Sequence, residues 1–191
     1  MALSNPYEGT RLPGFVGTPL PSAIVKVIDV DTEMEVPNGE SGELRVKGNI
    51  VFQEYWGKEE QTKKEFDKNG YFKTGDIGMF DTSVNSFKIL GRNSVDIIKS
   101  GGFKISALDI EREILEHPDI AEICIVAKKD ETYGEVVAAI IRMKDGKAKL
   151  TLKDLRDYLK DKMAKYKIPS EVLVIDDIPK NAMGKVNKKE L

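Results

Sequence analysis

Lys185 ends a short turn-rich segment and is the residue best suited to meet an anion. The segment reads Ile178-Pro179-Lys180-Asn181-Ala182-Met183-Gly184-Lys185, in which an asparagine and a glycine favour tight turns. A lysine ammonium on a flexible stem can neutralise a growing phosphate charge without a fixed fork geometry. The competing interpretation is a solvated basic tail, because Lys188 and Lys189 extend the run of positive charge.

Three further candidate sites contain glycine. In two of them a charged side chain follows the glycine, and in the third a pair of glycines leaves the backbone accessible. Asp76 follows Gly75 directly, so its carboxylate could accept hydrogen bonds from vicinal hydroxyls such as those of a ribose. Arg92 follows Gly91 and offers a cation with several donors at a strand end. The segment Ser100-Gly101-Gly102-Phe103-Lys104 could let a slender ligand approach the backbone. The structural alternatives are, in turn, an Asx turn, a surface arginine and a plain hairpin turn.

Other kinds of catalytic or metal site are not indicated. The single histidine, His117, precedes Pro118 and is interpreted as a helix stop, and the single cysteine, Cys124, lies in an apolar run and is interpreted as a buried hydrophobe. These two residues cannot build a His and Cys metal site, and no metal ligands are expected. Glu111 is interpreted as solvated. We find neither a Ser-His-Asp set nor a phosphate-binding P-loop.

Composition narrows the classes of partner. Of 191 residues, 40% are hydrophobic and 32% charged, which is ordinary for a globular protein. The 30 Lys and Arg residues are balanced by 32 Asp and Glu, so the net charge of -2 disfavours nucleic acid and anionic lipid as partners. The sequence has no apolar run of transmembrane length and no signal-peptide pattern, and a single cysteine fits a reducing compartment. The first residues resemble a chain cut in mid-domain rather than a designed N-terminus.

The elements that must position these residues change in character along the chain. The first part is turn-rich and strand-like, which predicts a small antiparallel sheet or barrel. Its clean alternation predicts that the 42–48 strand is half exposed. The expected elements are a strand at 23–30, a strand at 42–48, a brief helix at 58–67 and a strand at 87–92.

Beyond Arg92 helices and strands alternate, as in a compact α+β domain. Ser106 is expected to cap a helix that ends near residue 116, and Thr151 to cap a second helix over 152–163. The first of these helices should bury one apolar face formed by Leu108, Ile110, Ile114 and Leu115. The remaining elements are a hairpin over 97–105 and strands at 122–127, 136–143 and 171–175.

The order of the segments resembles the adenylate-forming superfamily of acyl-CoA synthetases, adenylation domains and luciferases. The resemblance covers essentially the whole chain and implies that 1–91 is the β-rich end of the large AMP-binding domain, 92–96 a hinge and 97–191 the mobile C-terminal domain. Within the superfamily, the segments 1–6, 94–99 and 181–185 are similar to those of malonyl-CoA synthetases. The matching blocks are Gly70 to Asp76, Gly91-Arg92 with Asp96, Ser100 to Lys104 running into 107–111, Tyr166 to Pro169, and Asn181 to Lys185.

The resemblance implies a role for each candidate residue. Asp76 would hold the ribose hydroxyls of ATP and of the acyl-adenylate, with Arg92 supporting the same nucleotide, and Lys185 would contact the α-phosphate during adenylation. The small domain would swing about Asn93, Ser94, Val95 and Asp96, a segment that is one residue longer than in many relatives. The CoA path would be lined by Gly101, Gly102 and Lys104.

The implied activity is that of an acid–thiol ligase for malonate or methylmalonate, using ATP, Mg²⁺ and CoA. The residues for adenine, the β- and γ-phosphates and the acyl group would lie in an upstream domain, so this chain by itself is expected to be inactive. Mitochondrial location would fit the resemblance, with the cytoplasm as the alternative. Two other functions stay open: a non-catalytic interaction module that keeps the fold, and an adenylating enzyme with another acid or acceptor.

Overall fold

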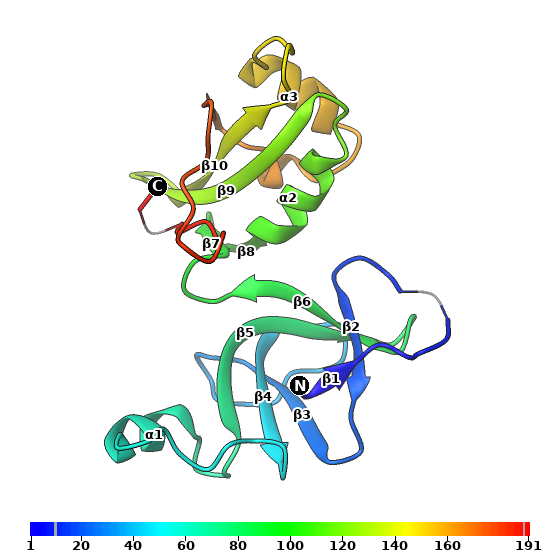
Figure 1. Cartoon of the computed structure of the whole chain (residues 1–191), viewed down its shortest axis with the longest axis vertical. Helices are drawn as coiled ribbons and strands as arrows, with labels where there is room; N and C mark the ends of the chain where they lie inside the picture. The colour runs from blue at the N-terminus through cyan, green and yellow to red at the C-terminus, as the bar shows by residue number, and fades with distance from the viewer. Residues whose placement is uncertain (10, 189) are drawn as a thin grey trace. The chain divides into compact units, whose positions relative to one another are not determined.

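The computed structural model describes residues 1–9, 11–188 and 190–191. Contacts within the chain divide it into two compact units, Met1–Asn93 and Ser94–Leu191 (Figure 1). The boundary falls inside the segment expected to act as a hinge. Hinge motion itself stays a prediction, and each unit is described separately.

The first unit is built on a six-stranded antiparallel sheet, as the turn-rich sequence predicts (Figure 1). The strand order is β1-β2-β6-β5-β4-β3. A short helix, α1 (Glu59–Glu65), lies between β4 and β5 in the chain. The strands are β1 (Leu3–Ser4), β2 (Phe15–Pro19), β3 (Ala23–Ile28), β4 (Gly42–Gly48), β5 (Phe72–Asp81) and β6 (Ser86–Arg92).

The prediction that the 42–48 strand is half exposed is wrong. Leu44 and Val46 pack inward as expected, but Glu43 and Arg45 on the opposite face are buried as well. These charged residues are accommodated because they pair with each other and with nearby carboxylates. Alternation gave the two faces correctly, but it could not show that a polar network covers the second face.

The second unit joins a mixed sheet to two helices (Figure 1). The sheet path is β11-β10-β7-β8, with β9 paired to β10, and β10 and β11 run parallel. A 3₁₀ turn, Lys165–Lys167, precedes the last strand. The elements are β7 (Ile97–Ser100), β8 (Phe103–Ser106), α2 (Ala107–Leu115), β9 (Ile120–Asp130), β10 (Gly134–Met143), α3 (Leu152–Leu159) and β11 (Glu171–Val174). The α+β class predicted from the sequence is confirmed.

Both predicted helix caps are present. The Ser106 hydroxyl accepts the Asp109 N–H at 3.1 Å, and Thr151 forms a reciprocal capping box with Asp154. Helix α3 ends at Leu159, earlier than the predicted residue 163. The predicted buried face of α2 is correct at Ile110 and Ile114, but Leu115 is 50% exposed.

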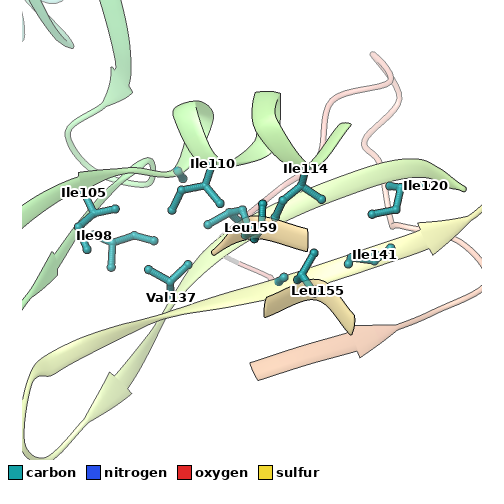
Figure 2. Packing of buried hydrophobic residues seen from close by; sticks show 12 residues of the cluster. Ile98, Ile105, Ile110, Ile114, Ile120, Val137, Ile141, Leu155 and Leu159 are labelled. Carbon is teal, nitrogen blue, oxygen red and sulfur yellow. The ribbon is translucent and has the colours of Figure 1, made fainter. Parts of the chain in front are cut away.

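The helices pack on the sheet of the second unit through aliphatic side chains. Figure 2 shows Ile110 and Ile114 of α2 near Leu155 and Leu159 of α3, with Ile141 of β10 in the same cluster. Each of these five side chains is fully buried, and such burial stabilises by roughly 1.5–3 kcal/mol per side chain. The second unit therefore has a core of its own to support the segments that carry candidate site residues.

Candidate functional site

Asp76 and Arg92 lie opposite each other on β5 and β6, which brings two predicted site residues together. Arg92 Nε donates to Asp76 Oδ1 at 2.8 Å, and Arg92 Nη1 donates to the Thr74 carbonyl at 2.8 Å. Both side chains are partly exposed, so a ligand can reach them. These two contacts hold the Arg92 guanidinium beside the Asp76 carboxylate and attach it to the backbone of Thr74.

Residues 74–76, here called the Asp76 loop, bulge out of β5 where its register with β4 shifts, and they are held by hydrogen bonds to β4 and within the bulge. Gly75 has φ of +71°, which suits glycine, and a Cβ added there would lie 3.3 Å from Arg92 Nη1. The Thr74 hydroxyl donates to the Leu44 carbonyl at 2.6 Å and accepts the Asp76 N–H at 3.0 Å. Glu43 Oε1 accepts the Gly75 N–H at 3.1 Å. The carboxylate of Asp76 is therefore presented by a loop with fixed backbone geometry.

Behind this loop lies a buried ionic cluster, the Arg45 network (Arg45, Glu33, Glu43 and Asp67). Arg45 is 2% exposed and donates to both oxygens of Glu33 at 2.6 and 2.7 Å. It also donates to Glu43 at 2.9 Å and to Asp67 at 3.2 Å. These hydrogen bonds, first that of Glu33, raise the pKa of Arg45 further above its ordinary value. Because Glu43 also holds Gly75, the network connects directly to the Asp76 loop.

The pKa values of Glu33 and Asp67 lie below their ordinary values, for Glu33 chiefly because of its hydrogen bonds with Arg45. Burial on its own would raise the pKa of Asp67, but the N–H groups of Tyr71 and Asn69 and the Arg45 guanidinium lower it overall. This network was not predicted from the sequence. The available signal was Glu43-x-Arg45, since residues two apart on a strand face the same side.

Of the four residues expected to form the hinge, the first and the last are bonded to different units. Asn93 donates its N–H to the Gly75 carbonyl at 3.0 Å, within the first unit. Asp96 is buried in the second unit, where its carbonyl accepts the Ala107 N–H at 2.8 Å and its carboxylate pairs with Lys188. Ser94 is exposed and Val95 half-buried between them. The change of bonding partners thus occurs across Ser94 and Val95.

Gly101 and Gly102 form the turn of the β7–β8 hairpin, with φ of +53° and +84°. Gly101 borders a cavity of about 450 Å³, whose other lining residues include Phe103, Tyr133 and Tyr166. The Phe103 and Tyr166 rings are stacked, with centroids 4.3 Å apart. Lys104 is exposed on β8 and is not among the residues that line this cavity, because it follows Phe103 and alternate side chains of a strand face opposite sides.

Lys185 sits at the end of an ordered turn, the Lys185 loop (residues 181–185). Asn181 Oδ1 accepts the N–H groups of Met183 and Lys185, each at 3.0 Å, and the Asn181 N–H donates to the Lys185 carbonyl at 2.8 Å. The Lys185 side chain is exposed. The loop therefore presents an ammonium group from a backbone that is closed on itself.

Two predictions about solvated charges are wrong. Glu111 accepts the Ile125 N–H at 2.8 Å, and Lys188, which the tail interpretation placed in solvent, is buried against Glu111 and Asp96. Both partners of Lys188 are distant in sequence, so local charge patterns could not reveal the contacts. Among the described residues, we find no cluster of potential metal ligands and no helix long and apolar enough to cross a membrane.

The site residues thus offer three groups with different chemistry. A fixed carboxylate next to an arginine suits vicinal hydroxyls, and an exposed ammonium on a turn suits a phosphate. The cavity beside the diglycine turn has aromatic walls and can accept a slender, partly apolar chain.

Two family models match parts of this chain. Residues 1–56 match the family model described as AMP-binding enzyme, and residues 109–185 match that described as AMP-binding enzyme C-terminal domain. The chain is 43% identical over 210 residues to mitochondrial malonate–CoA ligase ACSF3 of Xenopus laevis and 47% identical over 200 residues to malonate–CoA ligase of Arabidopsis thaliana. These alignments include all of this chain but 36% and 32% of the two relatives, so the chain spans about a third of their length.

A solved structure shows the same fold. The crystal structure of ATP-bound MatB from Rhodopseudomonas palustris matches with a TM-score of 0.87 and 38% identity, over all of this chain and 37% of that protein.

Proposed function

This chain belongs to the AMP-binding enzymes, and we propose that it supplies the C-terminal region of an ATP-dependent acid–CoA ligase that acts on malonate or methylmalonate. The observation that carries the proposal is the Asp76–Arg92 pair, held at 2.8 Å on a fixed loop, in the same chain as the Lys185 loop. Relatives whose names state malonate–CoA ligase activity support the choice of acid. Because the chain spans about a third of those relatives, the complete activity requires an upstream domain.

In the first half-reaction a substrate carboxylate oxygen attacks the α-phosphorus of ATP. A P–O bond forms to the acid, and the bond from the α-phosphorus to the bridging oxygen breaks, which releases pyrophosphate. Asp76 holds the ribose hydroxyls, with Arg92 fixing the orientation of its carboxylate. Lys185 places its ammonium at the α-phosphate, where negative charge accumulates and a desolvated cation stabilises it most. Mg²⁺ enters with the triphosphate.

In the second half-reaction the thiol of CoA attacks the acyl carbon. A thioester C–S bond forms, the mixed anhydride C–O bond breaks and AMP leaves. The diglycine turn and the cavity beside it fit the pantetheine arm, since Gly102 leaves open space where a side chain would stand. Lys104 is exposed and does not line this cavity. The thiol attack does not need the Lys185 ammonium.

The first half-reaction takes place at the α-phosphorus and the second at the acyl carbon, and each needs different groups, so a swing of the second unit about 93–96 would exchange them. Asn93 is bonded to the first unit and Asp96 to the second, which supports placing the pivot at Ser94 and Val95. We also propose a mitochondrial location, because the Xenopus relative carries that word in its name.

The test uses the full-length protein that contains this chain and its upstream domain. Malonate or methylmalonate with ATP, Mg²⁺ and CoA should yield AMP and the corresponding acyl-CoA, whereas acetate and succinate should react poorly. Asp76→Asn keeps the side-chain size but removes the charge that pairs with Arg92, and should lower kcat/KM for ATP about 10²-fold. Lys128→Met, in an exposed ion pair with Glu171, is the control and should change nothing.

Equal reaction rates with acetate and malonate would refute malonate or methylmalonate as the specific acid, but they would not refute the proposed acid–CoA ligase activity. Calorimetry with AMP, ATP and CoA addresses the ligase itself. Failure of every nucleotide to bind, together with tight binding of another protein, would favour the non-catalytic module.

A further inference from the structure

Lys188 is a largely covered cation that the two half-reactions do not use. Its side chain is 13% exposed, and its ammonium lies 2.7 Å from Asp96 Oδ1 and 2.7 Å from Glu111 Oε1. Both carboxylates are buried to a similar degree. We call Lys188, Asp96 and Glu111 the Lys188 cluster. A lysine is rarely placed in such a position unless its charge is matched.

The two carboxylates are themselves fixed by the second unit. Glu111 lies on α2 and accepts the Ile125 N–H of β9 at 2.8 Å. Asp96 lies two residues after the unit begins at Ser94, and its carbonyl accepts the N–H of Ala107 at the start of α2. Lys188 thus connects the C-terminal tail to Asp96, near the first residue of the second unit.

The Lys185 loop is anchored on both sides. Before it, Ile178 is 1% exposed and packs with Cys124 and Ile140. After it, Val186 packs on the same cluster and bridges back to Lys180, and Lys188 follows two residues later. The apolar contacts, the bridge between Lys180 and Val186 and the Lys180–Glu122 ion pair hold the base of the loop. The Lys188 ion pair connects the segment after the loop to Asp96.

The burial of apolar surface does not explain why a charged residue stands at position 188. Replacing a buried ion pair with apolar side chains is often neutral for stability, so burial alone does not account for a lysine there. An ammonium group that pairs with two fixed carboxylates is held within hydrogen-bonding distance of both. Burial on its own would lower the pKa of Lys188, but Glu111 and Asp96 raise it overall, so the ammonium stays charged.

We propose that Lys188 is a positioning residue that locks the Lys185 loop to the Asp96 segment, so that rotation at 93–96 carries the loop as a rigid extension of the hinge. The proposal rests on the proposed function for its catalytic consequence, but not for the lock itself. It predicts two separable effects of removing the Lys188 charge: a loop that samples many positions, and a selective loss of the adenylation step.

The lock is tested in the 191-residue chain by distance measurement between two spin labels. One label is placed on the loop by Met183→Cys and the other on α3 by Lys153→Cys, in a Cys124→Ala background. We expect Lys188→Met to broaden the distance distribution at least about twofold, and Lys188→Arg to restore it. The control Lys128→Met removes an exposed ion pair of the same unit and should leave the distribution narrow. A narrow distribution in Lys188→Met would overturn the proposal.

Lys188→Met leaves two buried carboxylates without a cation, so its fold is checked by circular dichroism. Should it not fold, the variant Asp96→Asn/Glu111→Gln/Lys188→Met, which removes all three charges together, is measured in its place with the same two outcomes.

The catalytic consequence is tested in the full-length protein. We expect Lys188→Met to lower kcat for adenylation about tenfold with the KM for ATP unchanged, while thioester formation from supplied acyl-adenylate stays at the wild-type rate. Equal loss of both steps would overturn the positioning role. A broadened loop in a protein whose wild type has no ligase activity would instead overturn the proposed function and keep the lock.

Discussion

Arg45→Met should destabilise the first unit strongly. The guanidinium forms ion pairs with Glu33 at 2.6 Å, with Glu43 at 2.9 Å and with Asp67 at 3.2 Å. Glu33 is half exposed and can return to water at little cost, but Glu43 and Asp67 would stay buried without a cation. Removing one partner of a buried ionic network costs about 3–5 kcal/mol. This corresponds to a fall of roughly 150-fold to 5,000-fold in the folding equilibrium.

The assay must resolve the two units, because the mutation acts on one of them. Urea titration followed by hydrogen exchange and mass spectrometry reports the free energy of opening for each peptide. Peptides from β3, β4 and β5 should lose the predicted 3–5 kcal/mol, whereas peptides from α2 and β9 should be unchanged. Lys26→Met, which removes the exposed ion pair with Glu35, is the matched control and should leave all peptides as in the wild type.

A loss below about 1 kcal/mol in Arg45→Met would refute the reasoning, because that is the range of an exposed ion pair. A large loss spread evenly over both units would also refute it, since no ion pair of the Arg45 network lies outside the first unit among the described residues.

Three further perturbations test other parts of the structure. Gly17→Ala would place a Cβ 1.8 Å from the Ser4 carbonyl oxygen, so it should cost at least about 2 kcal/mol in chemical denaturation, whereas Gly39→Ala, with a similar positive φ but no atom within 4 Å, should cost only about 1 kcal/mol. Burial raises the pKa of the Cys124 thiol to about 11, so stability should be full below pH 9 and fall as pH rises towards 11; Cys124→Ala should remove that fall, and an unchanged fall would assign it to other groups. The lowered pKa of Asp67 contributes stability above its ordinary value of 3.8 that is lost as pH falls through the lower folded value, and Asp67→Asn should flatten the acid limb of a pH titration monitored by circular dichroism.

Local signals in the sequence were sufficient for most elements. Hydroxyl caps at Ser106 and Thr151 marked two helix starts, because the cap and its N–H partner lie three residues apart. The strands could be predicted from the Gly101-Gly102 turn and from the runs of β-branched residues, because both signals act over a few residues. The pairing of Asp76 with Arg92 was accessible only through the resemblance, because it depends on the register of β5 against β6.

The charged residues that the sequence misplaced have partners far away in the chain. Arg45 is buried because Glu33 and Asp67 converge on it from other segments. Lys188 meets Asp96 across 92 positions, so a terminal charge run gave no hint of burial. Leu115 is 50% exposed because it lies about 100° around the helix from Ile114, outside the face that Ile110 and Ile114 bury.

The proposed role of Lys185 is in adenylation and not in thioester formation. Lys185→Ala in the full-length protein is measured in two ways: malonate-dependent exchange of pyrophosphate into ATP, and malonyl-CoA formation from supplied malonyl-adenylate and CoA. We predict that the first rate falls about 10²-fold to 10³-fold, as when a group that stabilises transition-state charge is removed, while the second stays within about threefold of the wild type. Equal loss of both rates, or no loss of the first, would contradict the account.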